Sequence, residues 1–505
     1  MNWKSAIALA FAACTPGVLA AFGVTTGSGY LSVDTGGGLV FRVSTSSGDI
    51  TSLKYNNIEC QDSSKYTHIG SGLGSATVSY KISGNYATIT IATSTLTQYY
   101  VAVSGQSAIY IGTYTTAEPS VGELRFIARL SKSALPKGGT AIEGSDVYSL
   151  NGQTRSKFFS SVQFIKDQVH GVTGNGVGVY MVMPGNAYET SGGGPFFRDI
   201  NNQDMNSGHM VTQSFRTGFF GPYAMVFTSG NAPSASLDTS FFANLGIKGY
   251  VAASGRGTVK GTVSGVPSGF TAVVGLDNSA AQYWGTVSGT SYTINGVKPG
   301  TYKATLYKKE LEVGTGSVTV SAGGTATLNL ASTESIKSNI WQIGLPDGTP
   351  SGFLNADKIE SMHPTDSRMS GWGPVTYTIG SSSPSSFPMA QFVAVNNPTT
   401  IKWTATSSQI GARTLRIRTT SSFAGGRPAI KVNNWSSANP AAPTKIDSRG
   451  VTRGTWRGYN QLYEYAIPSG TLVAGSNTFT ISVISGSSGD AFLSPNVVYD
   501  SIELY

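Results

Sequence analysis

The chain has 505 residues, of which 12% are charged and 39% are hydrophobic, and its formal net charge is +8. This composition excludes the charge-rich, hydrophobe-poor profile of a disordered protein, and the length suits several domains. The positive charge is scattered and no run of five Lys or Arg residues occurs, so we expect no nucleic-acid partner, whereas a diffuse positive field favours an acidic polymer.

The first twenty residues have the pattern of a signal peptide. Lys4 precedes an apolar run over 5–13, and 18–20 reads Val-Leu-Ala, which suits a signal-peptidase site. The run is too short to span a bilayer, and no later segment approaches 18 consecutive apolar residues. We therefore predict cleavage after Ala20 and a secreted, extracellular, monomeric protein that does not associate with membranes.

The chain has two cysteines, and the first, Cys14, lies in the predicted signal peptide. The mature chain would keep only Cys60, so it could form no intramolecular disulfide bond. We expect Cys60 to be a buried thiol that packs as a small hydrophobic group.

Residues 21–250 contain many short runs in which apolar and polar residues alternate. Examples are 87–91 and 108–112, and glycine-rich turns separate such runs. Alternation with period two predicts strands, and no run of ten residues has helical periodicity. We predict an all-β chain that begins with a large antiparallel sandwich, a super-sandwich with long loops.

Residues 251–335 predict a second, smaller sandwich. Asn295-Gly296 and Pro299-Gly300 are turn dipeptides, and alternating segments at 301–308 and 316–320 predict strands. About eighty residues of this kind suit a seven-stranded fibronectin-III-like sandwich.

Residues 336–505 predict a third unit that is again rich in strands. The end of the chain alternates cleanly after Val498, and eight or more strands in this length suit a jelly roll. Asn434-Trp-Ser is an N-glycosylation sequon, which an exported protein could use.

Three motifs in the first unit carry residues suited to chemistry on a sugar acid. They are Gly-Glu-Leu-Arg-Phe with Arg125, Thr-Arg-Ser-Lys-Phe with Arg155 and Lys157, and Asn-Ser-Gly-His with His209. Alternation over 123–130 puts Arg125 on the face of a strand opposite to Leu124 and Phe126. On residue type alone, each of these side chains is more often a solvated or structural group.

Several stretches of the chain together resemble fungal rhamnogalacturonan lyases of polysaccharide lyase family 4. The resemblance covers the whole predicted mature chain. It implies a large β-sandwich, a fibronectin-III-like domain and a jelly roll that resembles carbohydrate-binding modules. The stretches that carry it are 113–130, 139–146, 154–157, 192–200, 206–209, 247–257, 421–428 and 485–496.

The resemblance implies β-elimination at the galacturonic acid of rhamnogalacturonan I, without a metal ion or other cofactor. A base removes the C5 proton, the C4–oxygen bond breaks, and an acid protonates the departing oxygen. Arg125 would bind the carboxylate through two hydrogen bonds, Lys157 would be the base and His209 the acid, although these last two labels could be exchanged. Arg155 would favour the neutral form of Lys157, and His68 is a further candidate for the substrate groove.

Two other functions stay open at this point. A glycoside hydrolase could use paired carboxylates drawn from Glu123, Glu143 and Asp199. The second open function is that of a pectin-binding protein without catalytic activity. It stays open because members of the family carry a tyrosine-bearing insert before the Asn-Ser-Gly-His motif, and this chain lacks it. In this chain 201–205 contains no tyrosine, so Tyr188 and Tyr223 are the candidates to replace those side chains.

Overall fold

The computed structural model describes residues 22–70, 73–117, 124–137, 140–143, 147–150, 153–156, 158–160, 168–185, 187, 189–190, 194–199, 204–206, 215–443, 450–485 and 491–505. In these residues the chain forms strands and no α-helix, which confirms the all-β prediction. No helix in them is long and apolar enough to cross a membrane. The helical turns are all short 3-10 helices, namely η1 Ser240–Asn244, η2 Ala253–Gly255, η3 Pro384–Ser386 and η4 Gly450–Arg453.

The first unit is a sandwich of a five-stranded and a seven-stranded antiparallel sheet. The smaller sheet is a meander of consecutive strands: β1 Gly23–Gly27, β2 Tyr30–Asp34, β3 Leu39–Ser44, β4 Ile50–Tyr55 and β5 Ile58–Glu59. The larger sheet has the order β16 Val169–Thr173, β17 Gly178–Val182, β20 Gly218–Thr228, β10 Ala108–Thr115, β9 Leu96–Val103, β8 Tyr86–Ala92 and β7 Thr77–Ser83.

Inward-facing side chains of both sheets form the core of this sandwich. Phe41, Ile89 and Met225 are among its fully buried members, and Cys60 lies beside them with no exposed surface. Burial, assisted by the nearby charge of Glu59, raises the pKa of the Cys60 thiol to about 11. The prediction of a buried, hydrophobe-like cysteine is therefore confirmed.

Three small sheets of the first unit carry the sequence motifs. One has the order β19 Asp204–Asn206, β11 Leu124–Ile127 and β6 His68–Ile69. The second has the order β12 Thr140–Glu143, β13 Val147–Leu150 and β14 Gln153–Ser156, and the third pairs β15 Phe158–Ser160 with β18 Phe197–Asp199.

The second unit is a sandwich of two four-stranded sheets around its own core, which confirms the fibronectin-III-like prediction but has eight strands in place of the expected seven. One sheet contains β24 Ser291–Val297, β21 Gly257–Ser264, β27 Thr325–Thr327 and β28 Leu330–Ala331. The other has the order β23 Gln282–Thr286, β22 Ala272–Asp277, β25 Gly300–Lys308 and β26 Leu311–Val320.

The Asn295-Gly296 dipeptide forms a β-bulge, so its prediction as a turn is wrong. Asn295 pairs with Thr258 and Val297 pairs with Gly257, which leaves Gly296 as the extra residue, with a φ of 71°. A bulge and a tight turn both need a residue that tolerates positive φ, so the dipeptide alone does not separate them.

The third unit is a jelly roll of two five-stranded sheets that enclose one large core. One sheet contains β29 Trp341–Gly344, β38 Asn496–Leu504, β33 Arg413–Phe423, β36 Gln461–Ile467 and β31 Ala390–Phe392. The other has the order β30 Thr376–Thr378, β32 Thr399–Ala405, β37 Gly475–Ile484, β34 Arg427–Val432 and β35 Trp435–Ser436.

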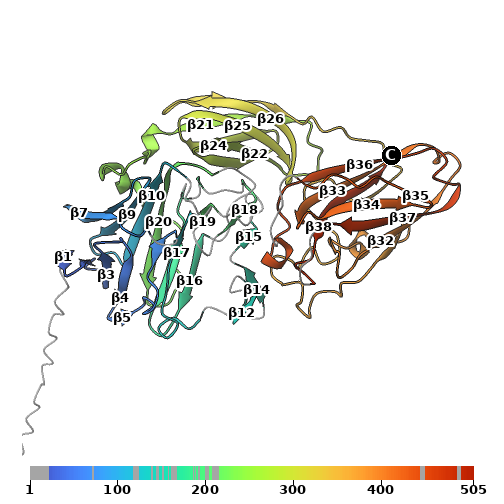
Figure 1. Ribbon diagram of the computed structural model, residues 1–505. Coiled ribbons are helices and arrows are strands. Elements are labelled where there is room, and N and C mark those ends of the chain that lie inside the picture. Colours follow the sequence, from blue (N-terminus) through green and yellow to red (C-terminus); the bar gives the residue numbers. More distant parts are fainter. Residues whose placement is uncertain are drawn as a thin grey trace, which may run out of the picture.

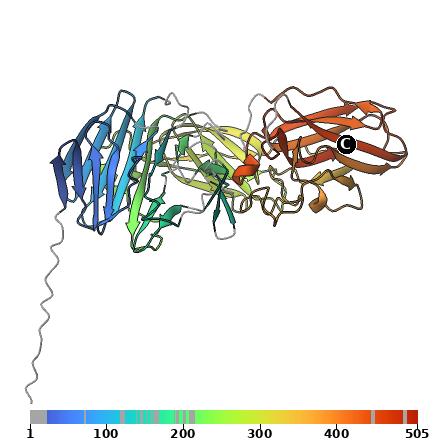
Figure 2. The same ribbon diagram turned by 60° about the horizontal axis from the view of Figure 1, so that its bottom comes forward.

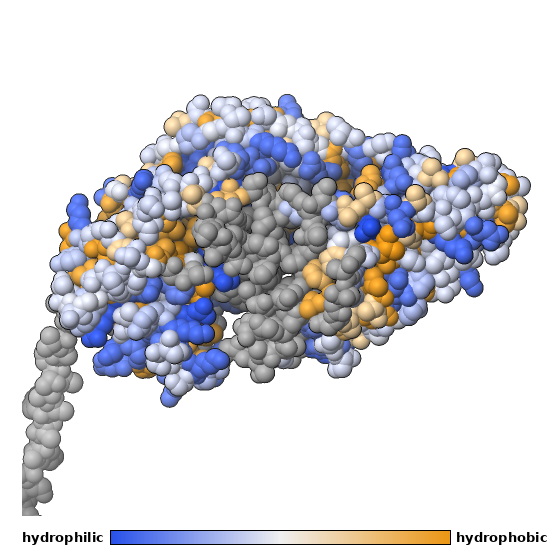
Figure 3. Space-filling view, in the orientation of Figure 1, coloured by the Kyte–Doolittle hydropathy of each residue, from blue (hydrophilic) through white to orange (hydrophobic). Residues whose placement is uncertain are grey.

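The three units lie so that the second bridges the other two. Figure 1 shows its sheets above the gap between the large sandwich and the jelly roll, and Figure 2 shows it between them from a second direction. The small sheets with β12, β14, β15 and β18 lie on the side of the first unit that faces the jelly roll. In Figure 3, hydrophobic residues gather on the jelly-roll flank that borders this central region.

Candidate active site

Strand β11 positions Arg125. Leu124 and Phe126 are each 1% exposed and belong to the core, and Phe126 makes edge contacts with the rings of Tyr100 and Tyr223. Arg125 lies between them on the opposite face and is half-buried, as the alternation predicts. The strand ends at Ile127, so the expected extension to 130 is wrong beyond that residue.

His68 lies on the same face of this sheet as Arg125. It pairs with Ile127, and Ile69 pairs with Phe126, while the carbonyl oxygen of Arg125 accepts a hydrogen bond of 2.6 Å from the Gly70 amide. In an antiparallel pair, opposed residues point to the same side, so Arg125, Ile127 and His68 share one face. The buried Nδ1 of His68 has no hydrogen-bond partner among the described residues.

The strand that leads into the Asn-Ser-Gly-His motif pairs with the other edge of β11. Asn206 is opposite Leu124 and Asp204 is opposite Arg125, so Met205 is the extra residue of a bulge. His209 itself lies outside the described residues. The backbone pairing thus brings the first residue of this motif and two of the predicted groove residues, Arg125 and His68, into one three-stranded sheet.

The Thr-Arg-Ser-Lys-Phe motif spans two sheets. Arg155 lies in β14 opposite Tyr148 of β13, whereas Phe158 begins β15 and pairs with Asp199 of β18. Lys157, between these strands in the sequence, lies outside the described residues, so its predicted role stays a prediction.

Several other predicted residues lie apart from this sheet. Asn434 is exposed in the turn between β34 and β35 of the jelly roll, which makes it accessible for glycosylation. Tyr223 is buried in the core, and burial raises the pKa of its hydroxyl, so it is not an open groove residue. Tyr188 lies outside the described residues.

The carboxylates proposed for a hydrolase lie on different strands. Glu143 ends β12 and Asp199 ends β18, while Glu123 lies outside the described residues. Within the described parts of the chain, no group of three or more His, Cys, Asp and Glu residues could hold a metal ion.

A buried ion cluster joins the first and second units. Glu189 has no exposed surface, and its carboxylate lies 2.7 Å from both Arg256 Nη1 and Lys298 Nζ. Tyr283 also donates a hydrogen bond of 2.6 Å to it. Burial opposes ionisation, but Lys298 and Arg256 outweigh it and lower the pKa of Glu189. No motif marked these residues in the sequence, because their chain positions are far apart.

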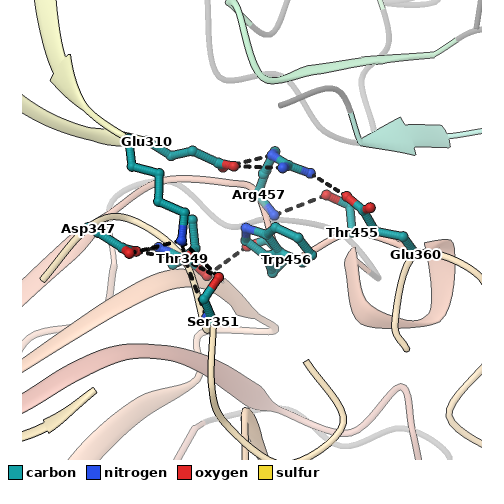
Figure 4. Close-up of polar contacts among 10 residues, drawn as sticks. Glu310, Asp347, Thr349, Ser351, Glu360, Thr455, Trp456 and Arg457 are labelled. Carbon is teal, nitrogen blue, oxygen red and sulfur yellow. Dashed lines mark hydrogen bonds and ion pairs between the residues drawn. The ribbon is translucent and has the colours of Figure 1, made fainter. Parts of the chain in front are cut away.

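A second set of ion pairs joins the second and third units. Arg457 contacts both carboxylate oxygens of Glu310, at 2.7 and 2.6 Å, and donates to Glu360 at 3.0 Å. Lys309 binds Asp347 at 2.9 Å and also reaches the hydroxyls of two neighbouring residues of the jelly roll (Figure 4). The hairpin between β25 and β26 is therefore fixed to the third unit by charge.

All three units meet around a cleft of about 500 Å³, named the junction cleft below. The first unit contributes 194–196, the second contributes residues around the β25–β26 hairpin, and the third contributes residues of β33, β38 and the segment 457–462. Sequence reasoning missed this cleft, because its walls are assembled only when the three units pack together.

Comparison with known proteins identifies the family. Consecutive parts of the chain match the models "Rhamnogalacturonan lyase B, N-terminal" over residues 22–249, "Polysaccharide lyase family 4, domain II" over 255–328 and "Polysaccharide lyase family 4, domain III" over 339–504. Rhamnogalacturonate lyase A of Aspergillus aculeatus is 54% identical, and the alignment covers 98% of this chain and 99% of that protein. The protein of the same name from Emericella nidulans is also 54% identical, with 96% of each chain covered. The chain therefore belongs to polysaccharide lyase family 4.

Proposed function

We propose that this protein is an exported enzyme that cleaves the rhamnose–galacturonic acid backbone of rhamnogalacturonan I by β-elimination. The observation that carries the proposal is its identity of 54% over nearly the full length of a protein named rhamnogalacturonate lyase A. The pairing of β11 with β6 and β19 supports it, because this sheet holds Arg125 and His68 on one face beside the strand that leads into the Asn-Ser-Gly-His motif.

Each residue has a defined task in the proposed reaction. The Arg125 guanidinium binds the galacturonate carboxylate and offsets the charge that develops when the C5 proton leaves. Lys157, neutral because of nearby positive charge, takes that proton, and His209 gives a proton to the departing O4. The products are a saturated chain end and an unsaturated uronide, and no water is consumed.

The experiment is an incubation with debranched rhamnogalacturonan I. Ultraviolet absorbance reports the new C4–C5 double bond, and mass analysis shows whether the fragments have gained water. We expect absorbance to rise without a gain of water. Fragments that carry an added water would instead identify a hydrolase, and binding without any fragments would identify a pectin-binding protein.

Variants test whether Lys157 and His209 both take part in the proton transfers. We expect Lys157→Ala and His209→Ala each to lower kcat by at least about 10²-fold, since general acid–base catalysis contributes about 10² to 10⁴-fold. Lys431→Ala, at an exposed position of β34, is the matched control and should leave kcat unchanged. Normal turnover in either active-site variant would remove that residue from the mechanism.

A further inference from the structure

The junction cleft has aromatic side chains from all three units. Phe196 of the first unit is 8% exposed and meets the ring of Tyr307 from the second unit edge-on, with 5.0 Å between the ring centroids. Val273 and Trp284 of the second unit pack against Phe196 and hold it in place. Tyr459 of the jelly roll lines the same cleft. Aromatic rings in a concave site provide apolar surface for the C–H face of a ligand.

Uncharged polar groups lie beside this aromatic wall. Asn460 and Gln461 line the cleft, and Asn460 is exposed while Gln461 is half-buried. Thr419 is directly opposite Gln461 in the β33–β36 pair, is 1% exposed, and has a hydroxyl that lacks a hydrogen-bond partner in the described parts of the chain. Amides and hydroxyls both donate and accept hydrogen bonds, which is what a sugar hydroxyl requires.

The charges in the cleft are balanced within the protein. Two arginines, Arg418 and Arg457, line it together with two glutamates, Glu310 and Glu312, and with Asp500, which stays protonated at neutral pH because burial raises its pKa to about 8. Arg457 and Glu310 are about 5% exposed and paired with each other at 2.6 Å.

Arg418 faces acids as well, because its Nε lies 3.8 Å from Glu503 and its charge also acts on Asp500. The lining therefore has no net positive charge with which to bind a uronate carboxylate.

The cleft is close to β15, the strand that directly follows the predicted base Lys157 in the sequence. Phe196 directly precedes β18, and Asp199 at the end of β18 pairs with Phe158, the first residue of β15. Three residues of extended strand cover roughly 10 Å. A polymer bound near the start of β15 could therefore extend into the cleft with another of its sugar units.

From these observations we infer that the junction cleft is a subsite for a neutral sugar of the polysaccharide, which stacks on the aromatic wall and hydrogen-bonds to Asn460, Gln461 and Thr419. This inference rests on the proposed function. The neutral sugar could be a rhamnose of the backbone or a sugar of a neutral side chain, and the experiment separates these two sources.

The test compares the Asn460→Ala/Gln461→Ala double variant with the intact protein. Both positions are at the surface of the cleft, so the fold should persist. We expect KM for rhamnogalacturonan I to rise about tenfold with kcat unchanged, as suits the loss of two hydrogen bonds to ligand. Thr404→Ala, at an exposed position on the other sheet of the jelly roll, is the control and should leave KM unchanged. An unchanged KM in the double variant would overturn the inference.

Salt dependence tests the neutral character of the ligand. The rise in KM caused by the double variant should be the same at about 0.1 M and about 1 M salt. Between these salt concentrations the screening length falls from about 10 Å to about 3 Å. If the rise in KM vanished at high salt, the cleft would bind a uronate and the inference would fail.

Two substrates identify the source of the sugar. If KM rises on both debranched and galactan-bearing polymer, the bound sugar is backbone rhamnose. If KM rises only on the branched polymer, the bound sugar belongs to a side chain of the polysaccharide.

The failure of the inference can be told from the failure of the proposed function. If the intact protein makes no unsaturated product, the lyase proposal fails, and retention of the protein on immobilised polymer still tests the cleft. In that case the double variant should be retained about tenfold more weakly than the intact protein and the Thr404→Ala control, and equal retention would overturn the inference.

Discussion

At the scale of single residues, Arg125 shows how the core of a sandwich can set the direction of a functional side chain. Its two neighbours in the strand, Leu124 and Phe126, are buried, so Arg125 must point to the opposite face. The pairing of β11 with β6 turns His68 to the same face as Arg125. The buried side chains that stabilise β11 thus also set the direction of Arg125, whereas Arg125 itself can be replaced without changing the core.

We expect Arg125→Ala to lower kcat/KM on debranched rhamnogalacturonan I by about 10² to 10³-fold, because a charge-stabilising donor is lost from the transition state. Arg125→Lys should recover part of this loss, since a lysine keeps the charge but cannot bind a carboxylate through a planar fork. Steady-state kinetics measure both effects.

Arg42→Ala, at an exposed position of β3, is the control for loss of an arginine. If its kinetics and those of Arg125→Ala were equal, the carboxylate-binding role of Arg125 would be wrong.

At the scale of elements, the sequence predicts which segments are strands better than it predicts their surroundings. Alternation identified 301–308 and 316–320, which lie in β25 and β26, because apolar side chains at every second position require one buried face. It also predicted a strand at the end of the chain, but every residue of β38 is buried, including Asp500 and Glu503. Asp500 is buried against the distant Asp347 and Gly348, and Glu503 against Arg416 and Arg418, and local alternation does not report such long-range contacts.

The site could be predicted only in part for the same reason. Arg125 and His68 share one face because β11 pairs with β6, a contact between segments far apart in the sequence. The walls of the junction cleft come from three units, so no local motif indicates them. Residue type and motif suggested which chemistry is possible, whereas proximity depends on long-range pairing.

Asp500, in β38, makes the stability of the folded protein depend on pH. Burial, and then the charge of Asp347, raise the pKa of the Asp500 carboxyl to about 8, whereas an unfolded aspartate titrates near 3.9. Between about pH 4 and pH 8 the folded protein therefore holds a proton that the unfolded chain releases. This contribution to stability is complete at low pH and is lost as the pH rises towards 8.

We expect Asp500→Asn to remove that dependence. An asparagine side-chain oxygen can still accept the hydrogen bonds that Asp500 accepts from the Asp347 and Gly348 amides, both 3.0 Å long. Relative to the intact protein, the variant should gain up to about 1.4 kcal/mol of unfolding free energy per pH unit across this window. Urea unfolding at several pH values measures the difference.

The control is Asp366→Asn, since hydrogen bonds from Arg368 lower the pKa of Asp366 to about 2. Its stability difference from the intact protein should stay constant between pH 5 and pH 8. Parallel curves for Asp500→Asn and the intact protein would show that Asp500 is ionised in the folded state.

At the scale of the whole molecule, buried ion pairs join each unit to the next. Glu189 of the first unit binds Arg256 and Lys298 of the second, and Arg457 of the third unit binds Glu310 of the second. Buried pairs cost desolvation when they form, so they add specificity of placement more than net stability. They fix the angles between units, and the junction cleft depends on those angles.

We expect Glu189→Ala to lower the unfolding free energy by about 3 to 5 kcal/mol, because two buried cations lose their partner. Calorimetry should also show the first and second units unfolding in separate transitions. Glu312→Ala removes an exposed carboxylate that lies 3.9 Å from Lys303, and it should cost less than about 1 kcal/mol. If the two variants lost equal amounts of unfolding free energy, Glu189 would not stabilise the contact between the first and second units.

The buried thiol of Cys60 gives the first sandwich an internal reporter. A thiol with no exposed surface and a pKa of about 11 offers almost no thiolate to an alkylating reagent at neutral pH. Labelling of Cys60 would therefore proceed only as fast as the core around it opens. The rate of that labelling reports local opening of the domain that carries Arg125, and no cysteine needs to be introduced for the measurement.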